Sequence, residues 1–374
     1  MMIEVKNIFT GNSESLELSS DVVSRIRKKQ HATGEIMMAP GLFDIQVNGY
    51  NSIDFNDDEL SVEKIEEVVE ELLKNGVTGF LPTLITNDPA IVERNLELFN
   101  RAVSGSDFIR RSIPGIHLEG PFISSEDGFS GAHDKQWARN PDWSLFEKWQ
   151  HISGNRIKLI TLAPELEGSL EFIRSCTKNN VKVAIGHSAA GPKEIMEAAD
   201  YGATLSTHLG NAIPKYLQRH NNAIINQLAE DKLYTSIIAD GHHLTNNLIK
   251  LILKLKKSKV LLVSDSTKFS SMAPGVYKTV IGGEVVLKAN RQLAVSGGDG
   301  QLAGSASALY QCVNYLSREK LLPLTEAWKA ASLGPINYMD NILMPSGNKN
   351  MVLFSYEDEA LNILMTIKED KCFF

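Results

Sequence analysis

Acidic and imidazole side chains stand at the ends of several short apolar segments of the chain. Glu119 ends the run "IHLE", His187 ends "VKVAIGH", and His208 follows "ATLST". Similar positions are held by Asp240, His242, His243 and Asp265. A carboxylate and two imidazoles facing one cavity can bind a catalytic zinc ion and leave its fourth position open to water. Such an ion activates the water and polarises a carbonyl, while a nearby carboxylate, here Asp265, takes the proton.

Each of these residues, taken alone, has a simpler explanation. An isolated histidine at a strand end is usually a hydrogen-bonded structural residue, and an aspartate after a strand is usually a helix cap. Ser188 follows His187, but without a G-x-S-x-G turn nothing indicates a nucleophile. His117 shares the strand face of Glu119 by period two and is either a supporting or a packed residue. The recurrence of polar groups after successive segments favours a site.

The segments that carry these residues predict parallel strands. They are short, apolar and rich in β-branched residues, and helical patterns separate most of them, as expected for buried strands of an α/β protein. The eight segments are 40–47, 77–83, 113–119, 156–164, 181–187, 203–209, 234–241 and 259–265. This count predicts a (β/α)8 TIM-like barrel, with its chemistry at the carboxyl ends of the strands. A doubly wound open sheet is the alternative, weakened because no G-x-G-x-x-G follows the first strand.

Amphipathic patterns between the strands predict the helices. The clearest is "SVEKIEEVVEELLKNG", in which Ser61 suits the cap and Gly76 the break after the last turn. The others are 88–104, 142–152, 167–179, 191–200, 222–230 and 245–257. After the eighth strand a β-hairpin is predicted around Gly282 and Gly283, followed by helices at about 303–318 and 324–333.

The two chain ends differ from the middle, because both contain short β-like runs too small to bury a core alone. We therefore expect residues 1–39 and 340–374 to form one small β-sandwich domain, and residues 40–339 to form the catalytic barrel.

Composition narrows the class of protein and of partner. The 374 residues are 43% hydrophobic and 22% charged, which is typical of a globular protein with a large core. A net charge of −7 without a basic stripe argues against nucleic acid as a partner. No run approaches the length of a membrane span, and no secretory signal is recognisable. The three scattered cysteines suggest reduced thiols and a cytoplasmic protein.

Several motifs in a fixed order carry a resemblance to a known family. They are "PGLFDIQVNGY", "HLEGPFIS" with "GAH", "TLAPE", "IGHSAA", "THLGNAI", "IADGHHL", "LVSDST" and "LAGSASAL". With them the chain resembles the N-acetylglucosamine-6-phosphate deacetylases of the amidohydrolase superfamily, over essentially the whole barrel. The resemblance implies a hydrolase that removes acetate from the acetamide of N-acetylglucosamine 6-phosphate.

The resemblance also implies roles for individual residues. Glu119, His187 and His208 would bind one divalent metal ion, usually zinc. Asp265 would act first as base and then as acid, and His133 of "GAH" would help to polarise the acetamide carbonyl. The H-x-H pair that binds a second metal in many amidohydrolases reads Gln46-Val47-Asn48 here, which indicates a one-metal site.

For the sugar phosphate, the resemblance points to Asn211, Ala212, Arg219 and His243. The family's counterpart of Arg219 reaches into the partner subunit's site, which implies a homodimer. An arginine suits phosphate because its planar donors can bind two oxygens.

Four features depart from the family pattern where specificity would be set. They are Gly210 in place of a bulky residue, His242 beside His243, the segment "KYLQRHNN" with His220, and "STKFSSMAPG" after Asp265. His242 and His243 therefore remain alternatives for one role. The substrate is either N-acetylglucosamine 6-phosphate or a related one, such as N-acetylgalactosamine 6-phosphate or a sugar without phosphate. A catalytically silent sugar-binding barrel is the remaining alternative.

Overall fold

Eight parallel strands form the centre of the molecule. The computed structural model describes residues 1–30, 34–279, 283–297, 301–340 and 350–374. The strands are β4 (Leu42–Val47), β7 (Val77–Ile85), β8 (Ile116–Glu119), β9 (Ile157–Leu162), β10 (Lys182–Ile185), β11 (Ala203–Ser206), β12 (Tyr234–Ile237) and β13 (Val260–Leu262). They pair in chain order, and a parallel bridge between Val47 and Ser266 joins the last strand region to the first. The predicted barrel and all eight of its strands are confirmed.

Residues on both faces of the barrel strands are buried because both faces are covered. All six residues of β4 are buried. Inside the barrel, side chains from successive strands form a closed cluster with Tyr338 and Met339 of α12 (Leu333–Met339). This filled interior is a core and not a channel, so chemistry is confined to the strand ends.

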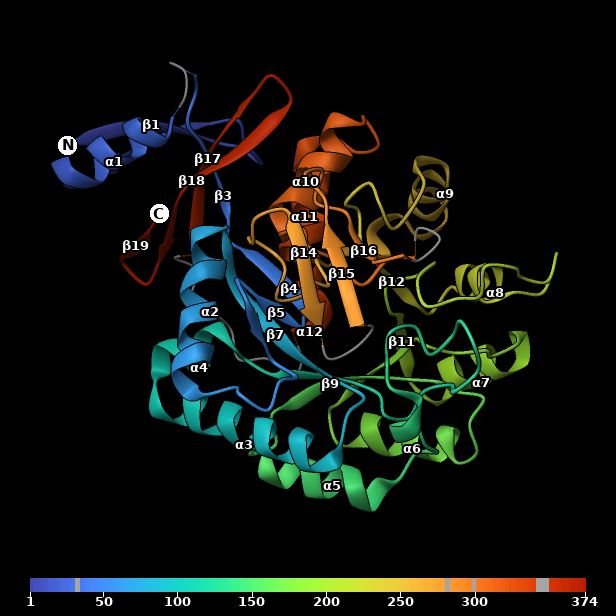
Figure 1. Ribbon diagram of the computed structural model, residues 1–374. Helices are drawn as coiled ribbons and strands as arrows, with labels where there is room; N and C mark the ends of the chain where they lie inside the picture. The colour runs from blue at the N-terminus through green and yellow to red at the C-terminus, as the bar shows by residue number, and fades with distance from the viewer. Residues whose placement is uncertain (31–33, 280–282, 298–300, 341–349) are drawn as a thin grey trace.

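Helices alternate with these strands and surround them (Figure 1). They are α2 (Val62–Lys74), α3 (Pro89–Gly105), α4 (Asp107–Ser112), α5 (Trp143–Ile152), α6 (Ser169–Lys178), α7 (Pro192–Tyr201), α8 (Ala223–Ala229), α9 (Asn246–Lys256), α10 (Leu309–Arg318) and α11 (Leu324–Ala331). Every predicted helix is present, although α10 begins six residues later than the predicted start at 303. The reason is that Ser305 bridges Ser266 at the barrel edge and keeps this segment extended. None of the helices in the described part of the chain combines the length and apolar character that a bilayer crossing needs.

The two chain ends lie together beside the barrel, as predicted (Figure 1). They contribute β1 (Met2–Asn7), β2 (Ser13–Glu17), β3 (Met37–Pro40), β17 (Met351–Glu357), β18 (Ala360–Lys368) and β19 (Lys371–Phe373) to one six-stranded sheet. Helix α1 (Ser20–Lys29), which the sequence reading missed, is capped by Ser19 and buries Val23 and Ile26 in the core of this domain. One sheet with a packed helix thus forms the domain, where two facing sheets were expected.

A small antiparallel sheet follows the eighth barrel strand. It comprises β14 (Gly275–Thr279), β15 (Gly283–Leu287) and β16 (Leu293–Val295). The predicted hairpin is therefore present, with Gly282 outside the described residues. Arg291 fixes this sheet to the barrel, because its Nη2 donates to the carbonyls of Phe269 and Ala306 at 3.1 and 2.9 Å.

Candidate active site

Three strand ends bring Glu119, His187 and His208 together. Glu119 Oε1 lies 3.1 Å from His187 Nε2 and 2.9 Å from His208 Nε2, and all three side chains are buried. Both histidines have left-handed backbones, with φ of 51° and 29° respectively. Such conformations cost about 1–3 kcal/mol each and persist only where the surrounding structure holds them, which is typical of functional positions.

The contacts of His187 are explained either by a cation between it and Glu119 or by a charged imidazole ring. His187 Nδ1 lies 3.1 Å from the carbonyl oxygen of Phe129, which can only accept, so this nitrogen carries the proton. In the neutral ring, Nε2 then presents a lone pair to the carboxylate oxygen of Glu119. Two acceptors at this distance repel unless a cation lies between them or the ring is charged. The donor set therefore fits a metal ion with oxygen and nitrogen ligands.

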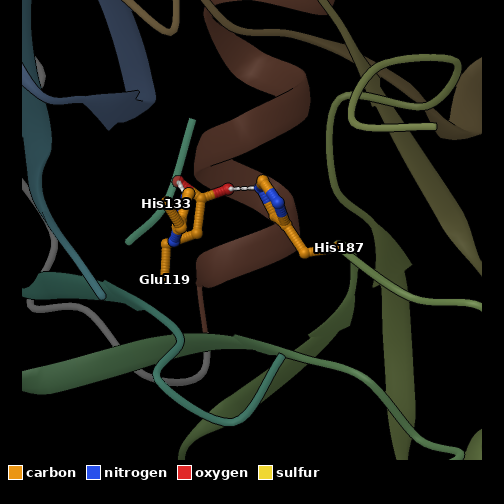
Figure 2. Close-up of side chains that lie close together, drawn as sticks. All are labelled: Glu119, His133 and His187. Carbon is orange, nitrogen blue, oxygen red and sulfur yellow. Dashed lines mark hydrogen bonds and ion pairs between the residues drawn. The ribbon is translucent and has the colours of Figure 1, made fainter. Parts of the chain in front are cut away.

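His133 is a further histidine at this site. Its Nε2 lies 3.8 Å from Glu119 Oε2, and its Nδ1 lies 2.9 Å from Thr86 Oγ1. Ligand atoms of Glu119, His133 and His187 all lie within 4.8 Å of one another (Figure 2). This compact group contains His133, whereas the sequence predicted His208 as the third ligand. His208 nevertheless lies closer to Glu119 than His133 does. We call Glu119, His133, His187 and His208 the metal cluster.

Two amide side chains occupy the positions that carry H-x-H in many amidohydrolases. Gln46 Nε2 donates to Glu119 Oε1 at 3.0 Å, and Asn48 Nδ2 donates to Asp265 Oδ1 at 2.7 Å. Both amides thus orient carboxylates of the site. Asp265 itself has a left-handed backbone, with φ of 47°, directly before the bridge that closes the barrel.

Burial and neighbouring charges shift the pKa values of Glu119, Asp265 and His133 by different amounts and in different directions. Burial opposes ionisation of Glu119, but charged His187 and His208 rings that donate hydrogen bonds to it outweigh burial and hold its pKa well below the usual value. Burial, together with the nearby charge of Glu119, raises the pKa of Asp265 to about 6. Burial also lowers the pKa of His133 to about 3, so this ring is neutral near pH 7. A carboxylate with a pKa near working pH suits general acid–base chemistry.

The residues predicted for the sugar phosphate are only partly brought together. Asn211 Nδ2 donates to the carbonyl of His208 at 3.0 Å, and Ala212 has a left-handed φ of 48°. Asn211 and Ala212 line a small pocket that His187 also borders. Arg219 is exposed farther along the same segment, and no contact in the described part of the chain joins it to the metal cluster.

The two adjacent histidines after β12 have different environments. His243 Nδ1 lies 2.8 Å from Asp240 Oδ2, and its side chain is only 6% exposed. His242 turns toward the small antiparallel sheet, with Nε2 2.9 Å from the carbonyl oxygen of Asn290. His242 is therefore occupied in joining two loops, which leaves His243 as the better candidate for contact with a substrate.

Three supporting residues were either not predicted from the sequence or were left with two alternative roles. His117 lies inside the barrel, with Nε2 2.8 Å from Thr161 Oγ1 and Nδ1 3.1 Å from the carbonyl of Ile45, so it is a packed residue without direct contact to Glu119. Thr86 contacts His133, and Glu165 binds the residues after His187. Glu165 belongs to the quoted motif "TLAPE", and this was the only sequence signal for it.

A comparison with family models defines the class of protein. The amidohydrolase family model matches residues 37–340. The chain belongs to the amidohydrolase family, whose members are metal-dependent hydrolases, and the buried carboxylate and histidines at the strand ends agree with this class.

Relatives of known function narrow the family to one branch. The chain is 34% identical over 281 residues to N-acetylglucosamine-6-phosphate deacetylase of Bacillus subtilis, covering 74% of this chain and 69% of the relative. It is 30% identical over 320 residues to the deacetylase of the same name from Mus musculus, covering 83% and 76%. The suspected resemblance to the N-acetylglucosamine-6-phosphate deacetylases is thereby confirmed.

Solved structures agree with this grouping. The N-acetylglucosamine-6-phosphate deacetylase from Pasteurella multocida superposes with a TM-score of 0.79 at 26% identity, covering 91% of this chain and 86% of that one. The enzyme of the same name from Thermotoga maritima gives a TM-score of 0.79 over 100% and 99% of the two chains at 24% identity, which supports the fold.

Proposed function

We propose that this protein hydrolyses the acetamide of N-acetylglucosamine 6-phosphate to glucosamine 6-phosphate and acetate. One observation carries the proposal: Glu119 Oε1 lies within 3.1 Å of both His187 Nε2 and His208 Nε2 at the carboxyl ends of barrel strands. The similarity to deacetylases of this name supplies the substrate.

In this proposal Glu119, His187 and His208 hold one divalent ion, most simply zinc. Carboxylate and imidazole ligands are those that zinc accepts in catalytic sites. When bound, the ion would lower the pKa of a water molecule and polarise the acetamide carbonyl. His208 is preferred to His133 as the third ligand because its Nε2 is 2.9 Å from the carboxylate, against 3.8 Å for His133.

Asp265 would move the proton. Asn48 binds Oδ1 of Asp265, which leaves Oδ2 to accept a proton from the attacking water. The same carboxyl group would then protonate the departing amine at its nitrogen. A pKa of about 6 allows both directions of transfer near neutral pH.

His133 would donate a hydrogen bond to the carbonyl oxygen as negative charge develops on it. The ring is neutral, so it has one N–H to offer. If Thr86 Oγ1 donates to Nδ1 across 2.9 Å, the proton of the ring is on Nε2, which lies on the side of Glu119. Such preorganised donors stabilise the transition state of amide hydrolysis.

At the other end of the substrate, Asn211, Ala212, Arg219 and His243 would bind the sugar phosphate. Because Arg219 is exposed, we propose that it completes a phosphate site in a homodimer. Apolar side chains near it, Tyr216 at 86% exposure and Ile225 at 46%, offer surface for a second subunit.

We further propose a division into a small domain of residues 1–39 plus 340–374 and a catalytic domain of residues 40–339. A hydrophobic cluster formed by the terminal strands and α1 supports it, although further residues of β17 and β18, such as Phe354 and Ile363, pack against the barrel domain. A cytoplasmic location is also proposed, because Cys176, Cys312 and Cys372 are free thiols.

A related acetylated sugar is the second candidate substrate. It is favoured by the departures at Gly210 and His220, which lie in the segment proposed to bind the phosphate. Activity on N-acetylgalactosamine 6-phosphate and on unphosphorylated N-acetylglucosamine, compared with activity on N-acetylglucosamine 6-phosphate, distinguishes the two candidate substrates.

The test is acetate release by the zinc-loaded protein from these three sugars in parallel. We expect turnover to be fastest with N-acetylglucosamine 6-phosphate and to disappear after chelation of the metal. Faster turnover of either other sugar would transfer the proposal to that substrate. A metal-loaded protein that binds the sugar and releases no acetate would indicate the silent sugar-binding barrel.

A further inference from the structure

The chain around His187 is held by contacts from two neighbouring loops. The carbonyl oxygen of His187 accepts from the backbone N–H of Ser124 at 2.9 Å, and its ring contacts the carbonyl of Phe129. Both contacts come from the segment after β8. They fix the start of the turn and the plane of the imidazole, but not the residues that follow.

The residues that follow His187 are held by Glu165, from the segment after β9. Glu165 Oε2 accepts from the hydroxyl of Ser188 at 2.7 Å, and Glu165 Oε1 accepts from the backbone N–H of Ala189 at 2.6 Å. The hydroxyl oxygen of Ser188 in turn accepts from the N–H of Ala190 at 3.0 Å. A carboxylate that accepts two short hydrogen bonds is a strong and directional anchor.

These contacts matter because His187 has a strained backbone. Its φ of 51° lies in the left-handed region, which a residue with a side chain adopts at a cost. An extended backbone at this position would turn the imidazole away from Glu119. Something must therefore stabilise the turn, and Glu165 is the side chain that binds the two residues directly after it.

We propose that Glu165 is a positioning residue for His187, whose carboxylate holds Ser188 and Ala189 and thereby keeps the imidazole aimed at Glu119. Glu165 touches neither the metal site nor the substrate in this assignment. It acts on the ligand through the backbone, whereas the usual support for a metal-binding histidine is a direct hydrogen bond to its ring. The inference rests on the proposed role of His187 as a metal ligand.

The test compares zinc affinity, by competition with a chelator, in wild type, Glu165→Ala, Glu165→Gln and Glu167→Gln. Loss of a supporting residue typically weakens metal binding 10–100-fold, and we expect an effect of about this size for Glu165→Ala. Glu165→Gln should restore most of the affinity, because its amide oxygen can still accept from Ala189 and its NH₂ can donate to Ser188. Glu167, two residues away and exposed, is the matched control and should change nothing.

Two further readouts separate positioning from general stability. The melting temperature of the metal-free protein should stay near the wild-type value in Glu165→Ala, while the increase caused by zinc becomes smaller. At saturating zinc, kcat should return toward the wild-type value with KM unchanged. If Glu165→Ala does not fold, Ser188→Ala removes one of the two hydrogen bonds and should weaken zinc binding by a smaller factor.

Wild-type zinc affinity in both Glu165→Ala and Ser188→Ala would overturn the inference and leave the proposed function intact. If wild type binds zinc but releases no acetate from any of the three sugars, the proposed function fails, while the affinity comparison still decides the role of Glu165. If wild type binds no metal, both proposals fail.

Discussion

The substrate loop, which we define as residues 209–222, directly follows His208 of the metal cluster, yet the cluster and the loop are built in opposite ways. In the metal cluster all four side chains are at least nine-tenths buried, and they come from separate strand ends and loops. In the substrate loop exposure increases along the chain, from buried Leu209 to Tyr216 at 86%. The contrast teaches that the fold by itself buries and orders the groups proposed for bond cleavage. In our proposal, a substrate or a second subunit completes the surroundings of the groups assigned to recognition.

The prediction with the largest expected effect tests which histidine, His208 or His133, is the third metal ligand. His208→Ala should lose zinc and, with it, all acetate release, because two ligands hold the ion poorly. His133→Ala should keep zinc but lower kcat by roughly 10²–10³, as when one oxyanion donor is removed. The zinc content of both variants after dialysis is the measurement. Zinc retained in His208→Ala and lost in His133→Ala would make Glu119, His133 and His187 the ligand set.

Asp265→Asn should lower kcat by roughly 10²–10⁴, because an amide cannot take the proton of the attacking water. Its zinc content should be unchanged. Asn48→Ala is the matched control, since it removes the hydrogen bond to Asp265 Oδ1 but keeps the carboxylate. We expect a smaller loss of kcat there. A fully active Asp265→Asn variant would remove the proton-transfer role from this residue.

In the substrate loop we expect Arg219→Ala to raise KM for N-acetylglucosamine 6-phosphate by about 10–100-fold, with kcat nearly constant. The estimate follows from about 1.5–3 kcal/mol for a hydrogen bond to a charged group. KM for unphosphorylated N-acetylglucosamine should not change. Arg174→Ala, which changes an arginine on α6, serves as control. An unchanged KM for the phosphorylated sugar would contradict the proposed role of the substrate loop in phosphate binding. Arg219 would then be a solvated surface charge.

The smallest effect is expected at Gly210, the junction between the two regions. Its φ is +91°, and a Cβ there would lie 2.8 Å from Leu244 Cδ2. Gly210→Ala should therefore lower the free energy of unfolding by about 1–2 kcal/mol. KM should increase a few-fold while kcat stays constant. Gly105→Ala, with nothing within 4 Å of the added Cβ, should leave stability nearly unchanged. A kcat that falls while KM increases would show that the two regions are not independent.

Much of the fold could be predicted because buried strands and helices leave a recognisable pattern of apolar residues in the local sequence. Buried parallel strands such as β13 read as continuous apolar runs, and α2 reads as an amphipathic helix with the expected cap at Ser61. Helix α1 escaped prediction because its ten residues bury only Val23 and Ile26, too few for a clear helical stripe. The segment before α10 was misassigned as helix because its extended form depends on the pairing of Ser305 with Ser266, which are far apart in sequence.

The site was predictable in its residue types and less so in its contacts. Strand ends marked Glu119, His187 and His208, and the structure brings these three together. The approach of His133 to Glu119 had no local signal, because His133 lies in a loop whose path the sequence does not define. The contacts of Glu165 could not be predicted either, although it lies in the motif "TLAPE", since its partners are 23 and 24 residues away along the chain.

By itself, the sequence determined the order of strands and helices and which strand ends carry carboxylates and imidazoles, because periodicity and residue type are local properties. Only the tertiary structure decided which of those groups meet. Glu119 contacts histidines 68 and 89 residues away because closing the barrel brings the ends of β8, β10 and β11 to one side. It also decided that His243 faces Asp240 while His242 joins another loop, a choice that depends on packing between segments 48 residues apart.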